Sequence, residues 1–151
     1  MQAEALTEFL RSGIALTRAL DLRVESCDGG RVRIRAPLAP NLNHHGTAFG
    51  GSLAALAVVG GWAAVHVGLV DAGIDADLVV RSSSLDYRRA LRSDLIVEAT
   101  IPAAAWSVFR ATLEAGERAR ISVESSVSEA GQPPALVAQA TYVALPSGLQ
   151  A

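Results

Sequence analysis

The chain has 151 residues, of which half are hydrophobic and 19% are charged, and its formal net charge is -2. This length suits one domain with a sizeable core and is too short for two ordinary domains, so we expect a single domain over residues 1–151. The slightly negative charge gives no support for nucleic-acid binding. The only cysteine, Cys27, leaves no internal disulfide and no cysteine-based metal site. A cytoplasmic location fits these features, and the apolar content indicates that a partner subunit covers part of the surface.

The N-terminal part predicts a helix followed by a hairpin. Apolar residues recur at roughly helical spacing between Ala3 and Leu20, and early acidic residues make this stretch unlike a signal peptide. In "RVRIRAP" the valine, isoleucine and alanine alternate with arginines, which is typical of a half-exposed strand. We expect this strand to pair with Leu22 to Cys27 across the Asp28-Gly29-Gly30 turn.

A long apolar segment follows, and residues 46–70 contain no Asp, Glu, Lys or Arg. About twenty such residues could cross a bilayer. However, the segment has few large aliphatic residues and no basic flank, and amphipathic strands surround it. We therefore favour a buried central helix from about Gly50 to Gly68, with no membrane contact. Gly60 and Gly61 would let the sheet approach closely, although each costs about 1 kcal/mol relative to Ala in a helix.

The remaining sequence predicts strands separated by turns. The "EAGE" and "EAGQPP" stretches supply turns between consecutive strands, which indicates antiparallel pairing. One apolar helix against one curved antiparallel sheet is an α+β architecture. The expected strands are Leu78 to Tyr87, Leu95 to Ile101, Val108 to Leu113, Ile121 to Val127 and Leu136 to Leu145.

The loop before the long helix, "NLNHHGTAFGGS", resembles the signature loop of hot-dog-fold thioester enzymes, and within them the YiiD C-terminal thioesterase-like family, which includes malonyl-ACP decarboxylases. The resemblance implies a hot-dog fold, with a long central helix wrapped by a curved antiparallel sheet. It also implies a homodimer or higher oligomer with the acyl site between subunits, and a substrate carried on the phosphopantetheine of acyl carrier protein or on coenzyme A. We expect no metal or other cofactor. The residues that match the motif are Asn41, Asn43, Gly46, Thr47, Phe49, Gly50, Gly51 and Ser52.

The start of the predicted helix provides a physical reason for such a loop. A helix N-terminus presents unpaired backbone N–H groups, and glycines allow a substrate to come close to them. Gly50 or Gly51 could donate to a thioester carbonyl oxygen, and the Asn43 amide could supply a second donor, forming an oxyanion hole. The alternative is that Asn43 only caps the loop or the helix. Given the surrounding motif, we favour Gly50, Gly51 and Asn43 as the catalytic groups.

Two departures from the hydrolytic relatives bear on the reaction. Phe49 stands where the relatives have a histidine, and the expected position of their helix carboxylate, about Val58, is apolar. Hydrolysis by the usual route needs a positioned base, whereas loss of carbon dioxide from a malonyl thioester only needs its enolate stabilised. We therefore favour a malonyl-thioester decarboxylase that yields an acetyl thioester for fatty acid synthesis. An acyl-CoA or acyl-ACP thioesterase and a non-catalytic acyl-thioester-binding module remain the alternatives.

Other polar residues have both a functional and a simpler interpretation. Arg88, Arg89 and Arg92 could bind a carrier phosphate or an acidic carrier surface, or form a solvated turn. Asp86 could be catalytic, although pairing with Arg88 or Arg89 is simpler, and His66 fits a core or interface position. One residue of the Ser82–Ser84 run could face the pocket, or the run could be an exposed edge. The predicted substrate-binding residues are Asn41, His44, His45, Thr47, Phe49, Ser52, Arg88 and Arg89.

Overall fold

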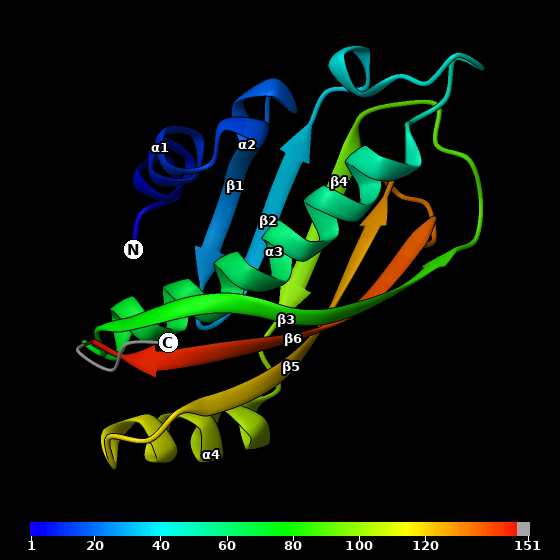
Figure 1. Cartoon of the computed structure of the whole chain (residues 1–151). Coiled ribbons are helices and arrows are strands. Elements are labelled where there is room, and N and C mark those ends of the chain that lie inside the picture. The colour runs from blue at the N-terminus through cyan, green and yellow to red at the C-terminus, as the bar shows by residue number, and fades with distance from the viewer. Residues whose placement is uncertain (148–151) are drawn as a thin grey trace.

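The computed structural model describes residues 1–147, and all six of its strands form one antiparallel sheet in the order β1-β2-β4-β5-β6-β3. A long helix, α3, lies across one face of this sheet (Figure 1). The elements, in chain order, are α1 (Ala3–Gly13), α2 (Ala15–Ala19), β1 (Arg23–Asp28), β2 (Arg31–Ala36), the 3-10 helix η1 (Ala39–Asn41), α3 (Gly50–Asp71), β3 (Ala76–Tyr87), β4 (Leu95–Thr100), α4 (Ala103–Glu114), β5 (Ala119–Ser128) and β6 (Leu136–Pro146).

Helix α3 is the centre of the core, as expected. A Cβ atom added at Gly60 would lie 2.6 Å from Cγ1 of Val97, and one added at Gly61 would lie 2.4 Å from the hydroxyl oxygen of Tyr142. The buried Tyr142 hydroxyl donates to the carbonyl of Val58 at 2.7 Å, and burial raises the pKa of Tyr142. Glycine is therefore required where the sheet presses closest to the helix, which confirms the packing interpretation of this pair.

The same helix is long and apolar enough to cross a membrane by length and composition alone. In the structure, however, 56% of its most apolar window is buried. Its buried residues include Leu53, Leu56 and Val65, which belong to the hydrophobic core shared with the sheet. Its apolar character is thus that of a core helix.

The N-terminal region differs in part from the expected single helix, because it forms two helices. Ile14 adopts an extended conformation between α1 and α2. The preceding residue, Gly13, favours a helix poorly. Buried Thr17 stabilises the break, since its hydroxyl lies 2.7 Å from the carbonyl oxygen of Leu10. The predicted hairpin is confirmed, with β1 antiparallel to β2 and Cys27 opposite Val32.

The prediction of a strand from Val108 to Leu113 was wrong, because these residues belong to helix α4. Pro102 precedes the helix, and Phe109 and Leu113 are buried four residues apart, which is a helical spacing. The adjacent Val108 is 70% exposed, so it lies on the outer side of the helix, away from Phe109 and Leu113. The "EAGE" turn consequently joins a helix to β5, whereas the predicted turn between β5 and β6 is confirmed.

The two edges of the sheet differ in how far they are covered by other elements. Helix α1 covers β1, and the backbone N–H of Val24 donates to the Thr7 hydroxyl at 2.9 Å. Among the described strands, β3 at the other edge pairs with β6 alone, and most of its residues are exposed, including the Ser82–Ser84 run. This long edge presents unpaired backbone groups to its surroundings.

Candidate functional site

The candidate site lies at the start of α3, where the chain leaves the loop at residues 42–49. Phe49 is extended and provides no side-chain cap, and the first backbone hydrogen bond into the helix runs from the N–H of Leu53 to the Phe49 carbonyl. The backbone N–H groups of Gly50, Gly51 and Ser52 have no acceptor among the described residues. This end of α3 can therefore donate to an oxygen atom that carries negative charge.

Two exposed aromatic rings flank these donors. Phe49 is 55% exposed and Tyr87 is 52% exposed. A Cβ atom at Gly51 would lie 2.3 Å from the Phe49 ring, and one at Gly50 would lie 3.4 Å from the Tyr87 ring. The Tyr87 hydroxyl also donates to the carbonyl of Gly50 at 2.9 Å. Tyr87 is thus a site residue that the sequence analysis missed.

The Asn43 side chain closes the loop in this structure. Its amide nitrogen donates to the hydroxyl of Thr47 at 2.8 Å and to the carbonyl of Ala48 at 3.4 Å. Its side-chain oxygen accepts from the backbone N–H groups of His45, at 2.8 Å, and Thr47, at 3.2 Å. These are the contacts of a loop cap, the alternative considered from the sequence. The oxyanion role of Asn43 stays a prediction.

Asn41 lies underneath the loop rather than on its surface. It is 1% exposed, and its amide donates to the carbonyls of Leu20 at 3.0 Å and Pro37 at 2.8 Å. Its backbone carbonyl accepts from the N–H of Phe49 at 2.7 Å. Asn41 therefore anchors the loop to the end of α2 and to the segment after β2, and it holds Phe49 at the start of α3.

The other predicted substrate-binding residues of the loop fall into two groups. Thr47 and Ser52 are buried, whereas His44 and His45 are exposed at the outer end of the loop. The two imidazole rings lie against each other, with centroids 3.8 Å apart. Of the predicted substrate-binding side chains in this loop and at the helix start, His44, His45 and Phe49 are the exposed ones.

The predicted arginine cluster is divided among separate partners. Arg88 pairs with Asp86 at 2.8 Å, which confirms the simpler interpretation of that carboxylate. Arg89 pairs with Glu129 at 2.7 Å and also donates to the carbonyl of Pro133. The backbone N–H of Arg92 donates to Glu129 as well. The pKa of Glu129 falls to about 2, first because of Arg89 and then because of the Arg92 backbone.

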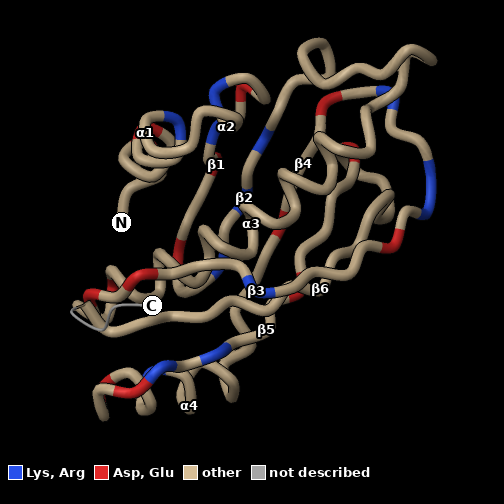
Figure 2. Tube along the Cα trace, viewed as in Figure 1, with Lys and Arg blue, Asp and Glu red and all other residues tan. Residues whose placement is uncertain are grey.

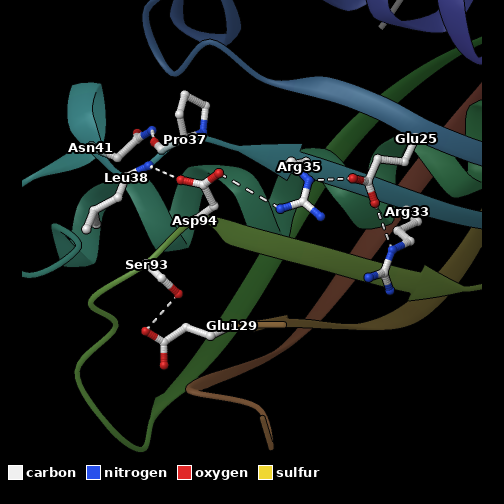
Figure 3. A network of polar contacts seen from close by, with 9 residues as sticks. All are labelled: Glu25, Arg33, Arg35, Pro37, Leu38, Asn41, Ser93, Asp94 and Glu129. Carbon is white, nitrogen blue, oxygen red and sulfur yellow. Dashed lines mark hydrogen bonds and ion pairs between the residues drawn. The ribbon is translucent and has the colours of Figure 1, made fainter. Parts of the chain in front are cut away.

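The carboxylates that border this region already have partners. Asp94 accepts from the backbone N–H of Leu38 at 3.1 Å and lies 3.9 Å from Arg35, and Ser93 donates to Glu129 (Figure 3). Helix α3 carries no acidic residue before Asp71, its last residue. His66, within the same helix, stacks against both Phe9 and Trp62, and burial lowers its pKa.

Comparisons with known proteins agree with this architecture. The chain is similar to a protein of unknown function from Chlorobaculum tepidum, with 26% identity, 96% of this chain and 94% of that chain covered, and a TM-score of 0.89. It also resembles a probable thioesterase from Pseudomonas aeruginosa (24% identity, 97% of each chain, TM-score 0.78). A thioesterase from Haemophilus influenzae has the same fold at 14% identity (99% of this chain, 94% of that chain, TM-score 0.79). The fold is therefore the hot-dog fold.

The family comparison covers nearly all of the described chain. A family model described as "Putative thioesterase (yiiD_Cterm)" matches residues 3–146. The match includes the loop, the glycine pair and all six strands. The chain belongs to the YiiD C-terminal family of thioesterase-like hot-dog proteins.

Proposed function

We propose that this protein decarboxylates a malonyl thioester. The observation that carries the proposal is the open start of α3, where the N–H groups of Gly50 and Gly51 have no acceptor among the described residues. A thioester carbonyl oxygen bound there would accept hydrogen bonds from these N–H groups. As the bond to the carboxylate breaks, its electron pair forms an enolate whose charge collects on that oxygen, and carbon dioxide leaves. A proton from water then completes the acetyl thioester.

The surroundings favour this reaction over hydrolysis. Hydrolysis needs a base to activate water, but the carboxylates near the site, Asp86, Asp94 and Glu129, are engaged with arginines or backbone donors. The position of the relatives' helix acid, about Val58, is apolar. Decarboxylation removes this requirement, because the substrate supplies the electron pair itself.

Hydrolysis is the second candidate, and the family supports it. The matching family is described as thioesterase, and neighbours with the same fold carry that description. His44 and His45 are the exposed titratable groups of the loop. In a thioesterase, one of them would have to position the attacking water. The third candidate is a binding module that holds an acyl thioester without turning it over.

We infer that the working form is a homodimer formed along β3. This strand has twelve residues, pairs with β6 alone and is exposed along most of its length. A second copy of β3 could continue the sheet and pair its free backbone groups. Such pairing would also bring a second subunit close to Tyr87 and the start of α3. A cytoplasmic location agrees with this proposal.

Product analysis tests the function directly. Purified protein is incubated with malonyl-CoA and, separately, with malonyl-ACP, and the products are followed by mass spectrometry. Decarboxylation yields an acetyl thioester, and in heavy water its methyl group gains one deuterium. Free malonate with free thiol would overturn the proposal in favour of hydrolysis. Saturable binding without either product would establish the binding module.

A further inference from the structure

Three arginines surround a shallow groove on the sheet, away from the start of α3. Arg81 comes from β3, Arg118 directly precedes β5, and Arg120 lies at the start of β5; Figure 2 shows basic segments on β3 and at the start of β5, with β6 between the two strands. The groove has a volume of about 490 Å³, and its floor is formed by Val79, Val143 and Leu145. Arg120, Val143 and Val79 lie opposite one another on three neighbouring strands. They therefore share one face of the sheet.

These arginines differ from most others in the molecule. None of the three has a carboxylate partner among the described residues, and no acidic residue lines the groove. Asp77, the nearest acidic residue on this face of β3, lies opposite Leu145 at one end of the groove and does not line it. Arg81 sits in a β-bulge between Val80 and Ser82, which turns its side chain toward the groove. Three arginines that line one groove, none of them paired with a carboxylate of the described residues, favour a ligand with several negative charges.

We propose that this groove binds the nucleotide end of coenzyme A. That end carries a diphosphate and a 3′-phosphate, so its charged groups match three guanidinium groups. The adenine ring would pack on the apolar floor formed by Val79, Val143 and Leu145. The phosphopantetheine of an acyl carrier protein carries a single phosphate, which matches three arginines less well. This inference rests on the proposed function, because it names the carrier of the thioester.

The position of the groove suits the active site of a partner subunit. Val79 lies eight residues from Tyr87, which is about 26 Å along its own strand. Antiparallel pairing of two β3 strands about their midpoint places Val79 of one subunit opposite Ser84 of the other. The partner's Tyr87 then lies opposite Ala76, about 10 Å along the strand from Val79. The pantetheine arm of a coenzyme bound in one groove would therefore pass around the end of the sheet. It would reach the start of α3 in the partner subunit.

Binding measurements with the full chain test the groove. We expect Arg81→Gln, Arg118→Gln and Arg120→Gln each to raise the Kd for coenzyme A by about tenfold, because each removes a charge-assisted contact. The matched control is Arg23→Gln, which is also exposed but lies on β1 at the opposite edge of the sheet, and it should leave the Kd unchanged. Wild-type protein should bind 3′-dephospho-CoA more weakly than coenzyme A, and this difference should vanish in the variant that lacks the arginine facing the 3′-phosphate.

Several outcomes would overturn the assignment. Unchanged coenzyme A affinity in all three variants would do so, as would an equal loss with Arg23→Gln. Loss of affinity for holo acyl carrier protein, with coenzyme A affinity intact, would identify a protein-docking surface instead. If no thioester is turned over but coenzyme A binding still depends on these arginines, the proposed reaction fails while the groove assignment stands.

Mixed dimers test whether the groove serves the partner subunit. One chain carries Arg118→Gln with Arg120→Gln, and the other carries Asn43→Ala in the loop. If the groove of one chain works with the loop of the other, each mixed dimer has one complete site. That site combines the intact groove of the Asn43→Ala chain with the intact loop of the arginine variant. At malonyl-CoA concentrations well below the Kd of the arginine variant, we expect the mixed dimers to be more active than either parent homodimer. Activity no higher than that of the parents would contradict the arrangement in trans.

Discussion

Asn43 has two candidate roles, and a pair of substitutions separates them. Its amide closes the loop onto Thr47 in the structure, and the proposed reaction would require it to donate to the thioester oxygen. We expect Asn43→Ala to lower kcat by about 10²–10³, as for removal of one oxyanion donor, with a smaller effect on substrate binding. Asn43→Asp keeps the acceptor for His45 and Thr47 but loses the donor. It should be at least as damaging, because it places negative charge beside the enolate.

Decarboxylation rates, measured together with thermal unfolding, distinguish the roles. A residue that only shapes the loop would give a lower melting temperature with kcat falling little in the Asp variant, whose loop contacts are largely retained. Full decarboxylase activity in Asn43→Asp would exclude the oxyanion assignment. Thr47→Val serves as the control, because it removes the same loop contact from the other side and leaves the Asn43 amide in place.

Phe49 provides a second test at the level of single residues. Phe49→His restores the side chain that hydrolytic relatives have at this position, but α3 still lacks a carboxylate. We expect no efficient release of free thiol from acyl-CoA substrates, because no group is positioned to take a proton from water. Thiol release is followed with a chromogenic thiol reagent. Robust thioesterase activity in this single variant would contradict the explanation based on the missing base.

How far the site could be predicted depended on whether its contacts are local. The start of α3 at Gly50 was predicted correctly, because the motif and the helix start are continuous in the sequence, whereas the catalytic role of Gly50 and Gly51 stays a prediction. Tyr87 was missed, because it meets Gly50 across 37 positions and nothing local indicates that contact. The separate partners of the clustered arginines could not be predicted for the same reason, since Arg89 pairs with Glu129 in a different turn of the chain.

At the level of elements, Gly61 should tolerate substitution poorly. Alanine usually stabilises a helix by about 1 kcal/mol relative to glycine, but here its Cβ would lie 2.4 Å from the Tyr142 hydroxyl. We expect Gly61→Ala to lower the free energy of unfolding by about 1–3 kcal/mol, as is usual for overpacking a core. Chemical denaturation measures the change. Gly13→Ala is the control, because nothing lies within 4 Å of its added Cβ, and it should be neutral or stabilising.

The loop at residues 88–94 should respond to pH through Glu129. Contacts with Arg89 and the Arg92 backbone lower the pKa of Glu129 from 4.5 to about 2. A depressed carboxyl pKa contributes stability above pH 4.5 that is lost as the pH falls toward 2. Glu129→Gln should therefore destabilise the protein at pH 7, and the difference from wild type should shrink by pH 3. Urea unfolding at both values checks this, with the exposed Glu117→Gln as control; an equal difference at both values would contradict the linkage.

Helix α4 shows why one element was assigned the wrong type. Its apolar residues Val108, Phe109 and Leu113 fit a short strand as well as a helix, since periodicity over six residues cannot separate them. The deciding contact is tertiary, because the ring of Trp106 lies against Gly68 of α3. The longer or strictly alternating segments, such as α3 and the β1–β2 hairpin, were predicted correctly from their pattern alone.

For the whole molecule, the two edges of the sheet indicate how copies would assemble. Helix α1 occupies the β1 edge, so β3 is the long edge that remains open to another strand. Pairing there would place both α3 helices on the same side of a continuous sheet. It would also bring each proposed coenzyme groove close to the other subunit's loop at residues 42–49, so that the proposed carrier site depends on this edge.

Hydrogen exchange tests this assembly directly. About every second N–H of β3 bonds to β6 within the chain, and the others point outward to the edge. In a β3-paired dimer, we expect both the inward and the outward amides of β3 to be protected from exchange. Dilution below the dissociation constant of the dimer should remove the protection of the outward amides only. Sedimentation over the same concentrations should show the dimer dissociating into monomers on dilution. The outward amides of β1 serve as the control, since α1 belongs to the same chain and dilution should not change their exchange. The edge-to-edge dimer would be excluded if the outward β3 amides exchanged at unprotected rates at every concentration and the protein sedimented as a monomer.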